Sequence, residues 1–175
     1  SLTEQIDNIS DIATSFSEFA KMPVPRNEVF DLVSVVQKIS DLYAEDDNIS
    51  LNAYLKERVA YVLGDRQFMS RVITNLVING IQSVPKDRKP IINLRLYRND
   101  DDNVVIIEVQ DNGNGIPENI RQRVFMPNFS TKIGGSGLGL AMAKRGVEHA
   151  GGNIWFETQD NRGTTFFIDL PLAIR

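Results

Sequence analysis

The stretch "KIGGSGLGLAMAK", residues 132–144, places four glycines within six positions and then continues as an apolar, helix-forming segment. Glycine loses more conformational entropy on folding than other residues, so such a cluster is kept mainly where another group must approach the backbone closely. The residues after Gly139 are good helix formers. The cluster therefore predicts a helix N-terminus, where free N–H groups favour an anion such as phosphate. Taken alone, the stretch leaves a flexible surface loop as the alternative.

Two familiar glycine-rich motifs do not match this stretch. A P-loop needs Lys followed by Ser or Thr after its last glycine, whereas Leu140 and Ala141 follow Gly139. A dinucleotide fingerprint needs a strand directly before the glycines, whereas residues 128–133 are mostly polar. The rest of the chain must therefore identify the motif.

Composition excludes several classes of protein. With 175 residues and 42% hydrophobic content, the chain can bury one core and carry a short appendage. Its net charge of −4 disfavours a nucleic-acid partner, and the absence of cysteine excludes disulfides and thiolate metal sites. No stretch resembles a membrane span or a signal peptide. We expect a soluble, cytoplasmic piece; because it starts at Ser1 and not at Met, we expect a fragment, whose parent protein could carry a membrane anchor elsewhere.

The first 22 residues have the apolar spacing of a helix-bundle seam. Leu2, Ile6, Ile9, Ala13 and Phe16 follow one another at intervals of 4-3-4-3 residues. Such a seam predicts residues 1–22 to be the tail of another, dimerising domain, with packing on the main domain as the alternative. The prolines that follow predict a linker over residues 23–30, and the main domain then covers residues 31–175.

Helical and strand patterns alternate along the main domain. Helices are expected to follow Asp31 and Asp65, both of which are suitable N-caps. Alternating apolar residues and turn signals predict strands. The fold class is therefore α/β, a two-layer α/β sandwich with a mixed sheet covered on one face by helices. The expected strands are residues 49–55, 58–64, 91–97, 104–110, 152–158 and 164–172.

The helix after Asp65 carries a polar line through its apolar pattern. Arg71, Asn75, Asn79 and Ser83 are four residues apart, so they share one helix face. Asparagine is a poor helix former, and its amide oxygen is a suitable ligand for Mg²⁺ while its NH₂ group can donate to phosphate. A solvent-facing polar stripe is the alternative.

An apolar strand, residues 104–110, ends at Asp111 and passes into the turn "NGNG". A carboxylate at a strand end can accept a hydrogen bond from an exocyclic amine, and Gly113 and Gly115 would let a flat ring approach the backbone. An ordinary Asx-Gly turn is the alternative. Gly163 and Thr164 stand at the mouth of the last strand.

In this order, these segments resemble the ATP-binding domain of histidine kinases, a member of the GHKL superfamily that includes gyrase, the MutL repair ATPase and a heat-shock chaperone. The resemblance spans residues 27–175 and implies the Bergerat-type ATP-binding fold. The linker "SEFAKMPVP", residues 17–25, is similar to that of nitrogen-regulation sensor kinases of the NtrY and NtrB kind. The matching motifs are the N box "RVITNLVINGIQS" (71–83), the G1 box "DNGNGI" (111–116), the F box "FMPNFSTK" (125–132), the G2 box "GSGLGL" (135–140) and the G3 element "GTTF" (163–166).

The resemblance implies ATP and Mg²⁺ as ligands and assigns roles to individual residues. Asp111 would bind the adenine amine with support from Thr164, Asn79 would hold Mg²⁺ and Asn75 would assist it. Lys132 would reach the β- and γ-phosphates, and residues 125–136 would form a mobile lid over them. Asn75, Asn79 and Lys132 are thus the expected catalytic residues, and the remaining nucleotide-binding residues are Gly113, Gly115, Ile116, Phe125, Gly135, Ser136, Gly137, Leu138 and Gly139.

Two departures from the family pattern bear on the reaction. Gly80 follows Asn79 where the family usually has alanine, which weakens the helix by about 1 kcal/mol without removing chemistry. Hydrolytic relatives carry a glutamate one turn before the metal asparagine, whereas this chain has Asn75, which is a poor general base. Transfer to a protein acceptor is therefore favoured over hydrolysis.

The acceptor implied by the resemblance is a histidine in a His-Glu-x-x-Asn-Pro motif on a dimerisation domain of the same protein. This chain lacks the motif, and His149 reads as the C-terminal residue of the helix that follows the glycines. We expect the catalytic domain of a two-component sensor histidine kinase, homodimeric in its full-length form, that relays phosphate to the receiver domain of a response regulator. The alternatives are a GHKL-type serine kinase or ATPase, and a non-catalytic nucleotide-binding interaction module.

Overall fold

The computed structural model describes residues 26–127 and 138–174. The expected segment 1–22 and most of the expected lid lie outside these ranges. The described elements are β1 (Glu28–Asp31), α2 (Leu32–Tyr43), β2 (Ser50–Leu55), β3 (Tyr61–Gly64), α3 (Arg66–Gln82), β4 (Ile91–Asn99), β5 (Val104–Gln110), the 3₁₀ helix η1 (Glu118–Arg123), α4 (Leu138–His149), β6 (Asn153–Gln159) and β7 (Gly163–Pro171).

The main sheet has five strands in the order β2-β4-β5-β7-β6. The first pair, β2 and β4, is parallel and the other pairs are antiparallel, so the sheet is mixed as expected. In the β5–β7 pair, Gln110 lies opposite Thr165. This register brings the end of β5 beside the start of β7, so that Asp111, which follows β5, lies beside Thr164.

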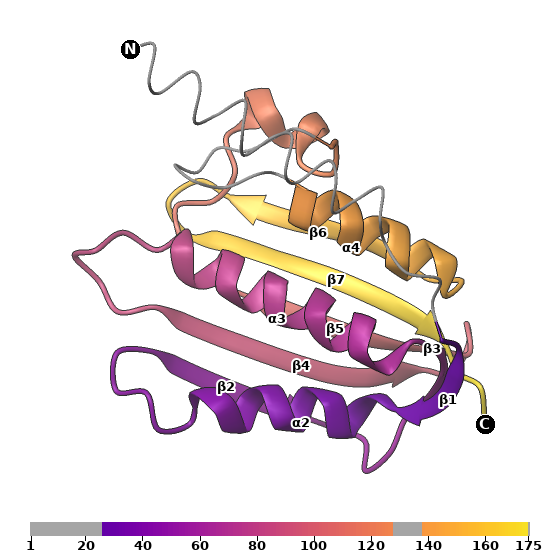
Figure 1. The fold of residues 1–175 in the computed structure, drawn as a ribbon. Coiled ribbons are helices and arrows are strands. Elements are labelled where there is room, and N and C mark those ends of the chain that lie inside the picture. Colours follow the sequence, from indigo (N-terminus) through magenta and orange to yellow (C-terminus); the bar gives the residue numbers. More distant parts are fainter. Residues whose placement is uncertain (1–25, 128–137, 175) are drawn as a thin grey trace.

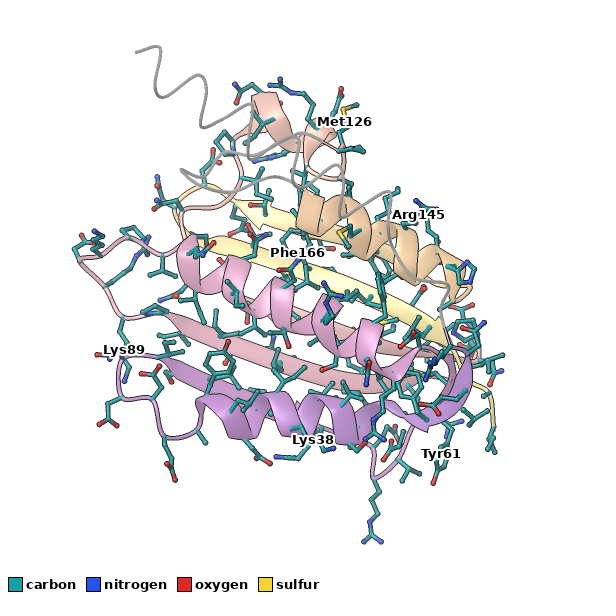
Figure 2. All side chains as sticks on the ribbon, in the orientation of Figure 1. Lys38, Tyr61, Lys89, Met126, Arg145 and Phe166 are labelled. Carbon is teal, nitrogen blue, oxygen red and sulfur yellow. The ribbon has the colours of Figure 1, made fainter. Side chains whose placement is uncertain are left out.

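Helices α2, α3 and α4 cover one face of the sheet, which confirms the two-layer sandwich (Figure 1). Each central strand buries alternate residues against these helices, as the period-two pattern of β5 and β7 predicts. Phe166, on β7, lies inside the molecule, whereas Lys38 lies at its margin (Figure 2). The largest fully buried side chains come from both layers: Leu32, Ile39, Met69, Ile73, Leu76, Ile92, Leu94, Leu96, Ile107, Ile168 and Leu170.

A small second sheet pairs β1 with β3 in antiparallel register. The sequence predicted the second of these strands but placed residues 23–30 in a linker, because the first strand is only four residues long and follows two prolines. Phe30 packs into the core while Val29 stays about half exposed. Tertiary pairing with β3 therefore decided the conformation of a segment whose own pattern was too short to predict it.

The site helix α3 starts at the expected N-cap. Asp65 Oδ1 accepts the backbone N–H of Phe68 at 3.1 Å, and Oδ2 accepts that of Arg26 at 3.0 Å. Partial burial raises the pKa of this carboxyl, but the backbone N–H groups of Phe68, Arg26 and Gln67 lower it by more, so the pKa lies below its ordinary value. The charged carboxylate thus holds the start of α3 and the chain that enters the domain.

Asp65→Asn tests this cap. Asparagine keeps one oxygen for capping but loses the charge at the helix N-terminus and the oxygen that accepts the Arg26 N–H, so we expect a loss of about 1 kcal/mol in unfolding free energy near neutral pH. Because the folded pKa is depressed, the wild-type advantage is present above the unfolded pKa and is lost as pH falls through the folded one. Urea unfolding from pH 7 down to about pH 3 should show the gap closing. A gap that is equal at both ends of this range contradicts the assignment, and the exposed Asp87→Asn serves as the control.

Within the described part of the chain, none of the helices is both long and apolar enough to cross a membrane.

Candidate functional site

Asp111 occupies the point where β5 ends, and it is 7% exposed. Its Oδ1 accepts two backbone N–H groups, from Gly113 at 2.8 Å and from Thr164 at 3.1 Å, and its own N–H donates to the Thr164 carbonyl at 2.9 Å. Thr164 is 53 residues away in sequence and belongs to β7. Backbone groups of two strands therefore orient one buried carboxylate, whose second oxygen lies on the side of α3.

A pair of threonine hydroxyls continues this corner of the sheet. The Oγ1 atoms of Thr158 and Thr164 are 2.8 Å apart, and Thr158 Oγ1 also accepts the backbone N–H of Ile116 at 2.8 Å. Thr158 lies on β6 and Ile116 on the loop after Asp111. The hydroxyl pair joins the two last strands to the G1 turn and places polar atoms beside the carboxylate.

The glycines of the G1 turn are required by protein packing. A Cβ on Gly113 would collide with the side chain of Ser83 at the end of α3. Gly115 has a φ of +80° and lies against the carbonyl of Gln159. We expected both glycines to make room for a flat ring, but the contacts of the turn with α3 and β6 already exclude side chains at these positions.

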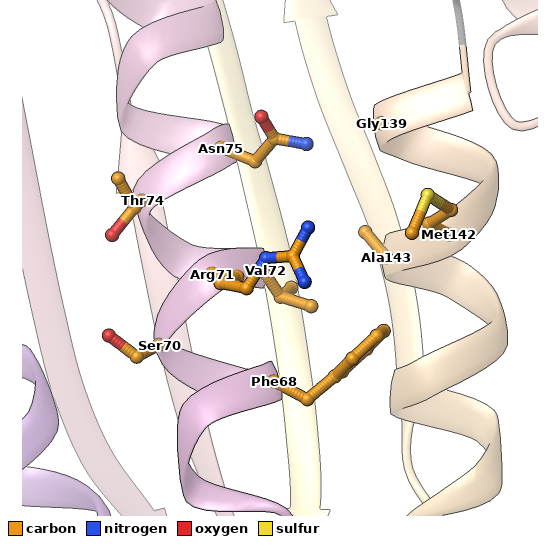
Figure 3. Close-up of a pocket in the computed structure, with 9 residues that line it drawn as sticks. All are labelled: Phe68, Ser70, Arg71, Val72, Thr74, Asn75, Gly139, Met142 and Ala143. Atoms are coloured by element: carbon orange, nitrogen blue, oxygen red, sulfur yellow. The ribbon is translucent and has the colours of Figure 1, made fainter. Parts of the chain in front are cut away.

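Helix α3, which carries the two expected asparagines, packs beside this corner at Gly80. Asn79 is half-buried and directly precedes Gly80, where a Cβ would lie 3.1 Å from Asp111 Cβ and 3.0 Å from Ile92 Cδ1. The absence of a side chain at Gly80 thus lets the carboxylate pack against the helix. Asn75 lies one turn earlier, is exposed and points toward α4 (Figure 3).

Helix α4 begins at Leu138, which confirms the predicted helix N-terminus at the glycine cluster. A Cβ on Gly139 would collide with the amide nitrogen of Asn75, so the first turn of α4 lies against the middle of α3. The side chain of Leu138 is not described. Lys132, Gly135, Ser136 and Gly137 lie outside the described residues, as do residues 128–136 of the expected lid.

Phe125 is the first residue of the expected lid, and it belongs to an aromatic cluster. Its ring centroid is 5.9 Å from that of Phe156 and 6.2 Å from that of Phe166. Lys144 Nζ lies 5.6 Å from the centroid of the Phe125 ring. These contacts anchor the start of the F box to β6, β7 and α4, next to the threonine pair.

The groups at this corner fit a nucleotide and a hard metal ion. A buried carboxylate and two hydroxyls can bind the edge of a base, and amide oxygens with phosphate oxygens can complete the shell of Mg²⁺. No group of three or more histidine or acidic residues that could hold a metal alone occurs among residues 26–127 and 138–174. A metal at Asn79 would therefore depend on ligands that the nucleotide brings.

The fold brings together most of the described residues that the sequence singled out. Asp111, Gly113 and Thr164 meet at one corner, where Gly80, the residue after Asn79, packs against Asp111, while Asn75 meets Gly139 further along α3. His149 is the last residue of α4, as predicted. Sequence reasoning missed Thr158 and Phe156, and it quoted Phe166 only as the last residue of the G3 element, without a contact. Thr158 sits in an alternating strand pattern that carries no sign of its partner on β7, so only pairing could have revealed it.

The chain is similar to known proteins in its sequence. The family model "Histidine kinase-, DNA gyrase B-, and HSP90-like ATPase" matches residues 64–174. Sporulation kinase B of Bacillus subtilis (strain 168) is 31% identical over 170 residues, which cover 95% of this chain and 39% of that protein. The chain thus spans about two fifths of this curated relative.

Solved structures share the fold. The catalytic domain of the histidine kinase ThkA superposes with a TM-score of 0.73 at 28% identity, over 84% of this chain and 96% of that one. The ThkA kinase in complex with the response regulator protein TrrA matches with a TM-score of 0.76 over 98% of this chain and 49% of that one, at 24% identity, which supports the fold alone. The chain belongs to the family of histidine kinase-, DNA gyrase B- and HSP90-like ATPases, as an ATP-binding catalytic domain of the sensor histidine kinase type.

Proposed function

We propose that this domain binds Mg-ATP and transfers the γ-phosphoryl group to a histidine on a dimerisation domain of its parent protein, for relay to a response regulator. The observation that carries the proposal is the buried Asp111 carboxylate, which β5 and β7 orient beside a helix with two asparagines. ThkA, which has the same fold, was solved with a response regulator protein, and we extend that partner class to this chain.

The adenine end of the site would be formed by Asp111 and the threonine pair. Asp111 Oδ2 would accept the exocyclic amine, while Oδ1 stays bonded to Gly113 and Thr164. A carboxylate accepts hydrogen bonds and donates none, so it selects a base that presents a donor at this place. Thr164, with Thr158 behind it, would bind the same edge of the base.

The phosphate end would lie between α3 and the first turn of α4. Asn79 would ligate Mg²⁺ and Asn75 would assist it or bind phosphate, while Gly139 presents backbone at the helix N-terminus. When bound, Mg²⁺ neutralises charge on the phosphates. We also propose phosphate contacts for four residues that lie outside the described ranges: Lys132, Gly135, Ser136 and Gly137.

The proposed step is the transfer of the γ-phosphoryl group from ATP to the acceptor histidine. A lone pair of the acceptor imidazole forms a bond to the γ-phosphorus, and the bond from that phosphorus to the β–γ bridging oxygen breaks. The bridging oxygen leaves with ADP and keeps the electron pair, and the proton on the other imidazole nitrogen passes to solvent. The domain contributes positioning and charge neutralisation. Asn75 cannot deprotonate a water molecule, which favours transfer over hydrolysis.

The test uses ATP labelled in its γ-phosphate. The chain is incubated alone and with a separately produced dimerisation segment of the parent protein that carries the acceptor histidine, and protein-bound label is followed beside released phosphate. We expect acid-labile, base-stable label on the added segment only, and none when its histidine is replaced by glutamine. Rapid phosphate release without protein label would instead identify an ATPase, and acid-stable label a serine kinase.

A further inference from the structure

A groove runs between α3 and α4 on the outer side of the helical layer (Figure 3). Its volume is about 290 Å³. Ser70 and Thr74 point away from α4, whereas Phe68, Arg71 and Asn75 project toward it. The described residues that line this α3–α4 groove are Phe68, Ser70, Arg71, Val72, Thr74, Asn75, Gly139, Met142 and Ala143.

The groove is continuous with the proposed phosphate end of the nucleotide site. Asn75 and Gly139, which we place at the phosphates, both line the groove and lie against each other at one end of it. The rest of the groove extends from this point toward the N-terminus of α3. A group in the groove next to Asn75 would therefore face the terminal phosphate from the side opposite to the base.

Arg71 is that group. It lies one turn before Asn75 on the same face of α3, and side chains four residues apart on a helix are neighbours, with about 6 Å between their Cβ atoms. Its guanidinium group lies between the two helices in the close-up. Among the described residues that line the groove it carries the only positive charge.

The surroundings of Arg71 favour an anionic ligand. Within residues 26–127 and 138–174, no ion pair or hydrogen bond engages its guanidinium group. The neighbouring groove residues Val72, Met142 and Phe68 are apolar and offer it no counter-charge. A guanidinium group with five donors in a planar fork matches the oxygens of a phosphoryl group.

We propose that Arg71 contacts the γ-phosphoryl group of ATP and stabilises its charge during transfer. The inference rests on the proposed function, since it takes the phosphate end to lie at Asn75 and Gly139. It adds a catalytic cation on α3 to the residues that the sequence motifs indicate. ADP lacks the γ-phosphoryl group, so Arg71 would contribute to the binding of ATP and not to that of ADP.

The test compares Arg71→Ala and Arg71→Lys with the wild-type chain. Calorimetric titration with Mg-ATP and Mg-ADP, without any acceptor, should show ATP affinity reduced about 5–10-fold in Arg71→Ala and ADP affinity unchanged. With the acceptor segment at saturating ATP, the transfer rate should fall about 30–100-fold, and Arg71→Lys should recover part of it. Arg58→Ala, which removes an exposed arginine from the loop before β3, should leave both affinities and the rate unchanged.

Three results would overturn the role of Arg71. The first is an equal loss of ATP and ADP affinity in Arg71→Ala, and the second is wild-type affinity and transfer rate in that variant. The third is a defect only in the KM for the acceptor segment, which would place Arg71 at the contact with that segment. Failure of the proposed function looks different, because the wild-type chain would then label no acceptor. The comparison of ATP with ADP still tests Arg71 in that case, since it needs binding only.

Discussion

Replacing Asp111 with asparagine should lower ATP affinity about 30–100-fold while the domain stays folded. The asparagine oxygen can still accept the N–H groups of Gly113 and Thr164 that Oδ1 now accepts. Its NH₂ group then replaces the oxygen that we assign to the adenine amine, so that two donors face each other. Losing this charge-assisted hydrogen bond should cost about 2–2.7 kcal/mol, which corresponds to a loss of affinity of about 30–100-fold.

Isothermal calorimetry with Mg-ATP measures the effect, and thermal unfolding checks the fold. Asp87→Asn is the matched control, because Asp87 is exposed in the loop before β4 and lies outside the proposed site. Unchanged ATP binding in Asp111→Asn would remove the nucleotide assignment of this corner. A large fall in melting temperature would show instead that the carboxylate acts mainly on the fold.

Replacing Gly163 with alanine should destabilise the domain by about 3 kcal/mol and weaken nucleotide binding at the same time. Gly163 has a φ of +129°, which non-glycine residues rarely adopt, and a Cβ there would collide with the Asp111 backbone carbonyl. The strand pair cannot relax without moving the carboxylate, because the Asp111 N–H donates to the Thr164 carbonyl and the Thr164 N–H donates to Asp111 Oδ1. A lowering of the melting temperature by roughly 6–12 °C should follow.

The control for this variant is Gly64→Ala. Gly64 is a buried glycine whose φ is not positive. An added Cβ would make ordinary contacts there, at 3.6 Å from Phe30 Cε1 and 3.7 Å from Ala150 Cβ. Its stability should stay within about 1 kcal/mol of the wild type. Equal melting temperatures for Gly163→Ala and the wild type would show that β7 can shift and that the turn does not depend on glycine.

Much of the fold was predictable because its signals are local. Asp31 and Asp65 cap α2 and α3 where the sequence placed N-caps, and alternating apolar residues located the strands of the main sheet. The strand β1 escaped prediction, because four residues after two prolines give no periodicity of their own. Its conformation depends on β3, whose paired residues lie 30 to 36 positions later.

Part of the candidate site was also predictable from local sequence. A carboxylate at a strand end, asparagines on a helix and glycines before another helix can each be recognised within about twelve residues of sequence. Other features depend on tertiary packing. Gly113 makes room for Ser83 because α3 packs against the turn, and Gly139 makes room for Asn75 because α3 packs against α4.

By itself, the sequence determined the order of helices α2, α3 and α4 and of the strands of the main sheet. It also determined the residue types available at the proposed nucleotide site, including asparagine at position 75. Only the tertiary structure decided that Thr164 and Thr158 complete the corner at Asp111, and that Arg71 projects into the α3–α4 groove beside Asn75. The physical reason is distance along the chain. Local patterns follow from dihedral preferences and burial of one face, whereas these contacts exist only once β5, β6 and β7 pair in register and two helices pack on the sheet.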